Sequence, residues 1–256
     1  MVIPKFDHCG VYAQVTQEEL STSDAEAWCE AANVYVREEV WDAWGAVLNR
    51  NPPNFIYYGR GLNLPMSLPE GPAGILVIKS KSPDPSTGGF HYVLGKMPAG
   101  RSYLSSSGPD ETFCHEAGEM AVNPLLNLWY PGPKGYDYSG EVNDPVQGPD
   151  YKKTVKVFGR SLEVVCPNFV YPAYFGIGNG TKYDHMGVLK APFSLTPGGY
   201  QIARLVNGDT IFLNPGEMAF GQRKFDELSR SSQLAKGITV PAGYQDMKRP
   251  SRPLIG

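Results

Sequence analysis

Residues 113–124 constrain this chain most, because a short helical pattern there carries side chains that bind metal ions. His115, Glu116 and Glu119 stand in the order His-Glu-x-x-Glu. Residues four apart share one face of a helix, so His115 and Glu119 are predicted to point the same way and to bind one ion together. Glu116 follows about 100° around the helix, where it can accept a proton without being a ligand.

The residues around this motif predict a helix over residues 108–123. Pro109 suits a first helical turn, and Pro124 disfavours helical geometry in the residue before it. Gly118 is unusual here, since a glycine inside a helix costs about 1 kcal/mol relative to alanine. We therefore expect another segment of the chain to approach the helix closely at Gly118. The competing interpretation is a chance match on a solvated helix face, because short motifs carry that risk.

A metal site needs more than this pair of side chains. A catalytic zinc takes three protein ligands and keeps one open position. Glu141 and Asp144 both follow the helix, and either can supply the third ligand. His91 is expected to be a packed histidine on a strand, and His185 a surface residue in a loop. Cys114 is offset by about 100° from the ligand face and is expected to be a buried thiol.

The predicted chemistry is metal-assisted hydrolysis with Glu116 as the general base. This pattern matches the His-Glu-x-x-His zinc peptidases, with a carboxylate in place of the second histidine. One imidazole and two carboxylates would neutralise most of the charge of Zn²⁺ and weaken its effect on bound water. The site can therefore be slow, take another divalent metal, or be vestigial.

The composition indicates a globular, loop-rich chain. It has 256 residues, of which 41% are hydrophobic, with 29 glycines and 23 prolines. A net charge of −3 and the lack of a long basic run argue against nucleic acid as a partner. The chain contains no run of about 18 apolar residues, so the sequence predicts no membrane span. The start of the chain also lacks the apolar core of a signal peptide. We expect a cytoplasmic or virion-associated location.

The order of predicted elements favours an α+β fold. We expect one domain over residues 1–230, with a mixed sheet packed on the metal-site helix and a β-rich, loop-rich part after it. Residues 231–256 are expected to form an extended tail that contacts a neighbouring subunit in a homo-oligomer or larger assembly, or folds back on its own domain. The predicted helix covers residues 23–44, and the predicted strands or extended segments cover residues 55–58, 74–78, 90–94, 101–104, 153–158, 162–166, 169–175, 198–205 and 210–213.

A resemblance extends these predictions. The runs at residues 115–124, 141–146, 168–175 and 192–200 resemble a family of bacterial and phage proteins with a His-Glu-x-x-Glu helix. The similarity spans roughly residues 74–205, and members of that family are interpreted as zincin-like metallopeptidases.

The resemblance implies a zincin-like fold, a zinc ion and a peptide or protein substrate. It also implies that His115, Glu116 and Glu119 keep their predicted roles and that Glu141 or Asp144 joins them. The sequence departs from the family pattern in two places. Asn123 replaces a more usual aspartate before the proline, and Gly118 replaces a larger apolar residue.

Two other function classes remain open. One is a structural or assembly protein, possibly of a virion, that keeps a zincin-like fold without catalysis. The other is a binding module stabilised by a metal. The metal content of the purified protein separates the structural protein from the enzyme and the metal-stabilised module. Loss of activity in Glu116→Gln with the metal retained would then indicate an enzyme and not a binding module.

Overall fold

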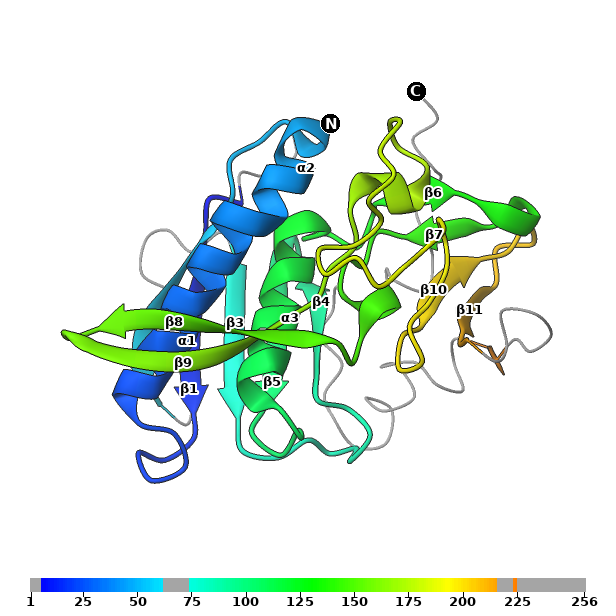
Figure 1. Ribbon diagram of the computed structural model, residues 1–256. Helices are drawn as coiled ribbons and strands as arrows, with labels where there is room; N and C mark the ends of the chain where they lie inside the picture. The colour runs from blue at the N-terminus through cyan, green and yellow to red at the C-terminus, as the bar shows by residue number, and fades with distance from the viewer. Residues whose placement is uncertain (1–5, 62–73, 216–222, 225–256) are drawn as a thin grey trace.

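The computed structural model describes residues 6–61, 74–215 and 223–224, which form two five-stranded sheets, a separate hairpin and a small set of helices (Figure 1). The fold class is mixed α and β, as the sequence predicts. The predicted tail over residues 231–256 lies outside the described residues. Across the described ranges, every helix is too short or too polar to cross a membrane.

Before the motif helix, the chain forms one strand, then three consecutive helical segments, then four strands. The helical segments are α1 (Thr22–Val34), the π-helix η1 (Tyr35–Val40), α2 (Trp41–Leu48), α3 (Pro109–Val122), and the short 3-10 segments η2 (Pro133–Gly135), η3 (Asp144–Val146) and η4 (Pro172–Phe175). The strands are β1 (His8–Gln14), β2 (Asn54–Arg60), β3 (Gly74–Lys79), β4 (Gly89–Leu94), β5 (Met97–Tyr103), β6 (Trp129–Pro131), β7 (Asp137–Ser139), β8 (Asp150–Val157), β9 (Arg160–Pro167), β10 (Gln201–Arg204), β11 (Thr210–Leu213) and β12 (Arg223–Lys224).

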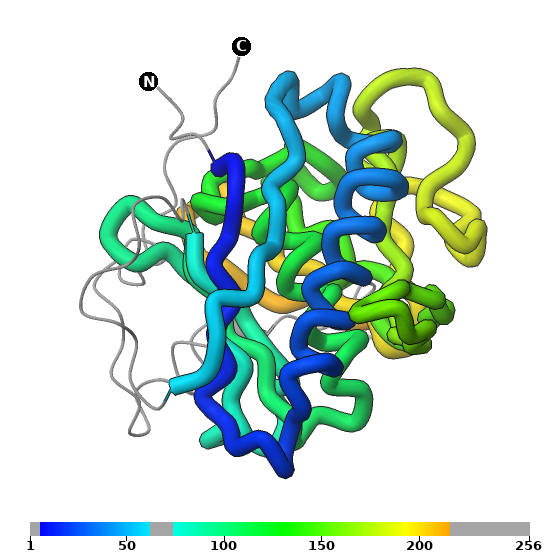
Figure 2. The backbone as a smooth tube through the Cα atoms, turned by 90° about the vertical axis from the view of Figure 1, so that its left-hand side faces the viewer, coloured from blue at the N-terminus to red at the C-terminus, as the bar shows by residue number. Residues whose placement is uncertain are grey.

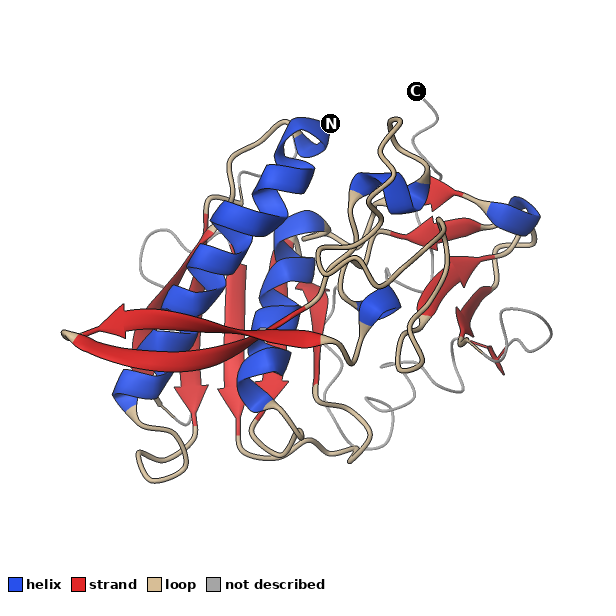
Figure 3. Ribbon diagram, in the orientation of Figure 1, coloured by secondary structure: helices blue, strands red, loops and turns tan. Residues whose placement is uncertain are grey.

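The first sheet has the strand order β2-β1-β3-β5-β4. Strand β1 is parallel to β2 and β3, and β3 is parallel to β5, whereas β4 pairs with β5 in the antiparallel direction. Helices α1 and α3 cover one face of this sheet, and the β8–β9 hairpin crosses over them (Figures 1 and 3). Helix α3 is therefore enclosed between the sheet and the hairpin, and every residue from 113 to 122 is buried.

The second sheet has the order β12-β11-β10-β7-β6 and lies to the side of α3, on the right in Figure 1. The predicted extended segments over residues 198–205 and 210–213 contain β10 and β11, which form an antiparallel pair. We expected residues 169–175 to be extended, and this prediction is wrong. Within this segment only Val170 makes a β-bridge, and the 3-10 segment η4 follows it. Pro172 explains the change, since proline lacks a backbone donor for strand pairing and suits a first helical turn.

The N-terminal helical segment is longer than its sequence pattern predicts. The side chain of Ser21 caps α1 by accepting a hydrogen bond from the Asp24 amide, so the helix begins at residue 22, one position before the predicted start at residue 23. The helical segment continues through Gly45 to residue 48, where Asn49 takes a left-handed conformation with φ of 48°. Figure 2 shows this segment running alongside β1 and β2. Strand β1 was not predicted, although it is the centre of the sheet's parallel half.

Candidate metal centre

A cluster of acidic and histidine side chains is buried where α3 meets the edge strand β4 and the segment that follows β7. Helix α3 contributes the three motif residues, β4 contributes one histidine, and the segment around η3 contributes two carboxylates. All of them are at most 5% exposed: His91, His115, Glu116, Glu119, Glu141 and Asp144. A group of charged side chains this deep in a protein needs partners or bound cations, because desolvating a charge is costly.

The first half of the cluster surrounds Nε2 of His115. This atom lies 3.1 Å from Oε1 of Glu119 and 3.1 Å from Oδ1 of Asp144. Two ligand atoms on a tetrahedral zinc, with bonds of about 2.0–2.2 Å, stand about 3.4 Å apart. The three donor atoms therefore lie close to the separation that a shared ion requires. The ring's other nitrogen, Nδ1, faces Oε1 of Glu111 at 3.8 Å.

Asp144 reaches this position because another segment approaches α3 closely at Gly118. A Cβ atom on Gly118 would lie 2.7 Å from Oδ1 of Asn143 and 2.9 Å from Cε1 of Tyr35. The Asn143 side chain donates hydrogen bonds to the Tyr35 hydroxyl at 2.6 Å and to the Asn168 carbonyl at 2.8 Å. The close approach that we predicted at Gly118 is confirmed, and it fixes the residue directly before Asp144.

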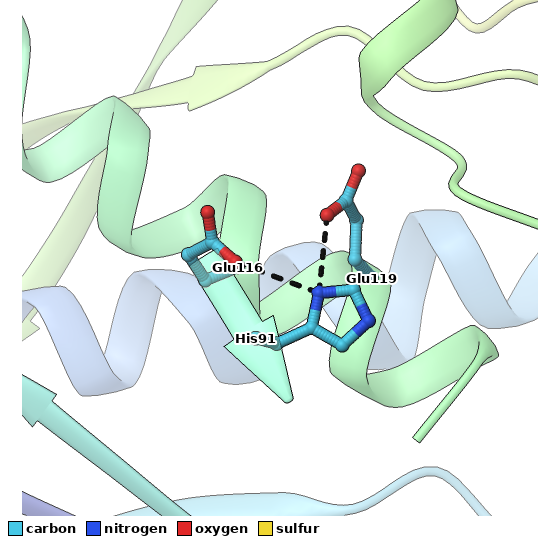
Figure 4. A group of neighbouring side chains, drawn as sticks. All are labelled: His91, Glu116 and Glu119. Atoms are coloured by element: carbon cyan, nitrogen blue, oxygen red, sulfur yellow. Dashed lines mark ion pairs between the residues drawn. The ribbon is translucent and has the colours of Figure 1, made fainter. Parts of the chain in front are cut away.

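The second half of the cluster surrounds His91 (Figure 4). Its Nδ1 lies 3.3 Å from Oε2 of Glu119 and 3.6 Å from Oε2 of Glu116. Its Nε2 lies 3.4 Å from Oε2 of Glu141. His91, which we expected to be a packed histidine on its strand, lies inside the cluster. The sequence did contain one indication of this position. Side chains alternate between the two faces of a strand, and the neighbouring Phe90 and Tyr92 pack on the face away from α3. That alternation turns His91 toward α3.

The two candidates for a third ligand occupy different halves of the cluster. Asp144 lies beside His115, whereas Glu141 lies beside His91 and accepts a hydrogen bond from the Ser139 hydroxyl at 3.2 Å. The structure also groups Glu116 with His91 and Glu119 as potential ligands. Glu116 packs tightly under β4, since a Cβ atom at Gly89 would lie 2.8 Å from Oε1 of Glu116.

Ion pairing sets the charge of the cluster when no cation is bound. Burial by itself lowers the pKa of His91, but the carboxylate of Glu141 and the two α3 glutamates raise it to about 10. Burial also opposes the charge of His115, yet Glu119 and its other acidic neighbours raise its pKa well above the usual value. The pKa of Glu119, which burial alone would raise, is held well below its usual value by His115 and His91. A metal ion must displace these protons from the rings before it can bind there.

Cys114 is not part of this arrangement. It is fully buried on α3, and its thiol meets that of Cys166 in the core.

No family model, curated protein or solved structure matches the chain. The geometry of the cluster, with two groups of three ligand atoms that each lie within 4.8 Å of one another, is therefore the basis for a functional proposal.

Proposed function

We propose that this protein is a metal-dependent hydrolase whose ion is held by His115, Glu119 and Asp144. The observation that carries the proposal is the position of His115 Nε2, 3.1 Å from one oxygen of each carboxylate. Zinc is the proposed ion, although carboxylate ligands also suit Mn²⁺ and other divalent metals. When bound, such an ion polarises a carbonyl group and lowers the pKa of water.

The chain's own residues would divide the remaining work. Glu111 faces the second nitrogen of His115 and orients the ring, as carboxylates commonly do for histidine ligands. Glu116 is the proposed proton acceptor when a single ion is bound, because it is the carboxylate that follows His115 on the same helix. His115 is the point of access, since its side chain keeps 6% exposure whereas those of Glu119 and Asp144 keep none.

The arrangement of the first sheet supports a zincin-like fold and a peptide substrate. In zincin-type domains, the active-site helix packs under a mixed sheet whose edge strand borders the substrate cleft. Here α3 follows β5 directly, and the antiparallel strand β4 is last in the strand order beside that helix. A peptide or protein substrate is proposed on this resemblance together with the hydrolytic chemistry.

Metal content and activity test the proposal in sequence. Purified protein should contain a divalent ion by elemental analysis, and His115→Ala should lose it. Equal metal content in the two proteins would overturn the metal site. With the ion at His115 retained, hydrolysis of a mixed peptide library should be lost in Glu116→Gln and kept in Glu163→Gln, an exposed control of the same chemistry on β9.

One observation favours a non-catalytic alternative, a structural or assembly protein. The cluster is almost completely enclosed, and two large apolar side chains stand exposed at hairpin turns, where Phe158 is 75% and Val206 is 87% exposed. Each is a single exposed residue rather than part of a patch, so this alternative rests on their availability to a partner chain. A protein that binds metal tightly and hydrolyses no peptide, and whose assembly state changes in Phe158→Ser, would support this alternative.

A further inference from the structure

We propose that the cluster holds two metal ions rather than one, with Glu119 as the bridging ligand. The second ion would be bound by Nδ1 of His91, Oε2 of Glu119 and a carboxylate oxygen of Glu116. This inference rests on the proposed function in one respect, because the ion at His115 and the second ion would both be bound by Glu119. The two ions differ in depth, since the His91 side chain is fully buried and that of His115 is 6% exposed.

The orientation of Glu119 is the first observation. Its two oxygens face different histidines, with Oε1 at 3.1 Å from His115 Nε2 and Oε2 at 3.3 Å from His91 Nδ1. Both separations are close to the spacing of about 3.4 Å between ligand atoms on one zinc ion. A carboxylate that offers one oxygen to each of two ions is the bridge that a two-metal site needs.

The second observation concerns the orientation of the two histidine rings. His91 directs Nδ1 at Glu119 and Glu116 and directs Nε2 at Glu141, 3.4 Å away. His115 repeats this division, with Nε2 toward its candidate ligands and Nδ1 toward Glu111. A metal-binding histidine usually donates its other N–H group to a carboxylate, which fixes the tautomer. Glu141 thus takes a positioning role for His91, and each ring has one nitrogen for a metal.

The third observation is that several buried polar atoms of the cluster lack a regular hydrogen bond. Nδ1 of His91, both oxygens of Glu119 and Oε2 of Glu116 are buried and form no hydrogen bond of regular geometry with the described residues, and they face one another or His115 at 3.1–3.6 Å. Buried polar atoms are normally satisfied, so these atoms point to a ligand that the side chains converge on. A cation between His91, Glu116 and Glu119 would satisfy one atom from each residue.

Charge favours a pair of ions over a single one. Four fully buried carboxylates, those of Glu116, Glu119, Glu141 and Asp144, surround the two rings. Two divalent cations would balance their four negative charges while both imidazoles stay neutral, as metal binding requires. Occupation of the cluster by one ion and occupation by two differ in the number of ions bound per chain.

Titration of metal-free protein with Zn²⁺, followed by removal of loosely bound ions and elemental analysis, decides between them. We expect two ions per chain in the wild type, one in Glu116→Gln and one in His91→Phe. Glu163→Gln should keep both. With Mn²⁺ as the probe, two ions that share a carboxylate are magnetically coupled, so the EPR spectrum should differ from that of the single ion left in Glu116→Gln.

The possible outcomes separate this inference from the proposed function. One ion in the wild type and one in Glu116→Gln would overturn the second site and leave the first intact. No bound ion in the wild type would overturn both. Glu116→Gln is nearly isosteric, and an unchanged circular dichroism spectrum would establish that its loss of one ion is not due to unfolding.

Discussion

Replacing Gly118 with alanine tests whether the close contact beneath α3 positions the metal ligands. An alanine inside a helix is normally about 1 kcal/mol more favourable than glycine. Here the added methyl group would lie 2.7 Å from Oδ1 of Asn143 and 2.9 Å from Cε1 of Tyr35, well inside ordinary contact distance. Overpacking of this kind costs about 1–3 kcal/mol, and displacing Asn143 weakens two buried hydrogen bonds worth about 1 kcal/mol each.

The net expectation for Gly118→Ala is a loss of about 1–3 kcal/mol in the free energy of unfolding, measured by urea denaturation in the presence of a chelator. Because Asn143 precedes Asp144, the affinity for Zn²⁺ should fall by about 10- to 100-fold, the usual effect of disturbing residues that support ligands. A variant about 1 kcal/mol more stable than the wild type, with unchanged zinc affinity, would show that Gly118 does not hold Asn143 and Asp144 in place.

A double-mutant cycle locates the origin of the cost. Asn143→Ser removes the side-chain atoms that the new methyl group meets first. If that contact is responsible, Gly118→Ala should be less costly in the Asn143→Ser background, with a coupling free energy above about 0.5 kcal/mol. Additive effects would assign the cost to Tyr35 instead.

Three further predictions concern stability. Asn33→Ala should cost about 2–3 kcal/mol in urea denaturation, because its buried amide exchanges two hydrogen bonds with the backbone of Phe55, at 2.7 and 2.9 Å. Arg50→Met should cost about 1–3 kcal/mol, since Arg50 donates to the last carbonyls of α3, and an unchanged denaturation midpoint would contradict this. In metal-free protein, the raised pKa of His91 stabilises the fold fully below its unfolded value of 6.5 and loses this effect as pH rises toward about 10, so the melting temperature in chelator should be lower at about pH 9 than at about pH 6.

The local elements of this protein could be predicted from the sequence. The motif helix was expected over residues 108–123 and spans residues 109–122, because its prolines and helical periodicity act within a few residues. The glycine at position 118 indicated a close approach for the same kind of local reason, the cost of glycine in a helix. Strand β1 was missed because it is buried on both faces, so its apolar residues Cys9, Val11, Tyr12 and Ala13 do not alternate with polar ones.

The composition of the cluster was decided by tertiary structure. His91 belongs to it because β4 pairs antiparallel with β5, which places the strand along α3, and this pairing depends on contacts between segments distant in sequence. Asp144 and Glu141 lie only three positions apart, and no local rule assigns one to each histidine. The packing of Asn143 against Gly118 and Tyr35 makes that assignment. Local sequence was thus enough to place the helix and the proposed ligand pair of His115 and Glu119 on it. Which other side chains converge on that pair depends on long-range packing, so it became apparent only in the folded chain.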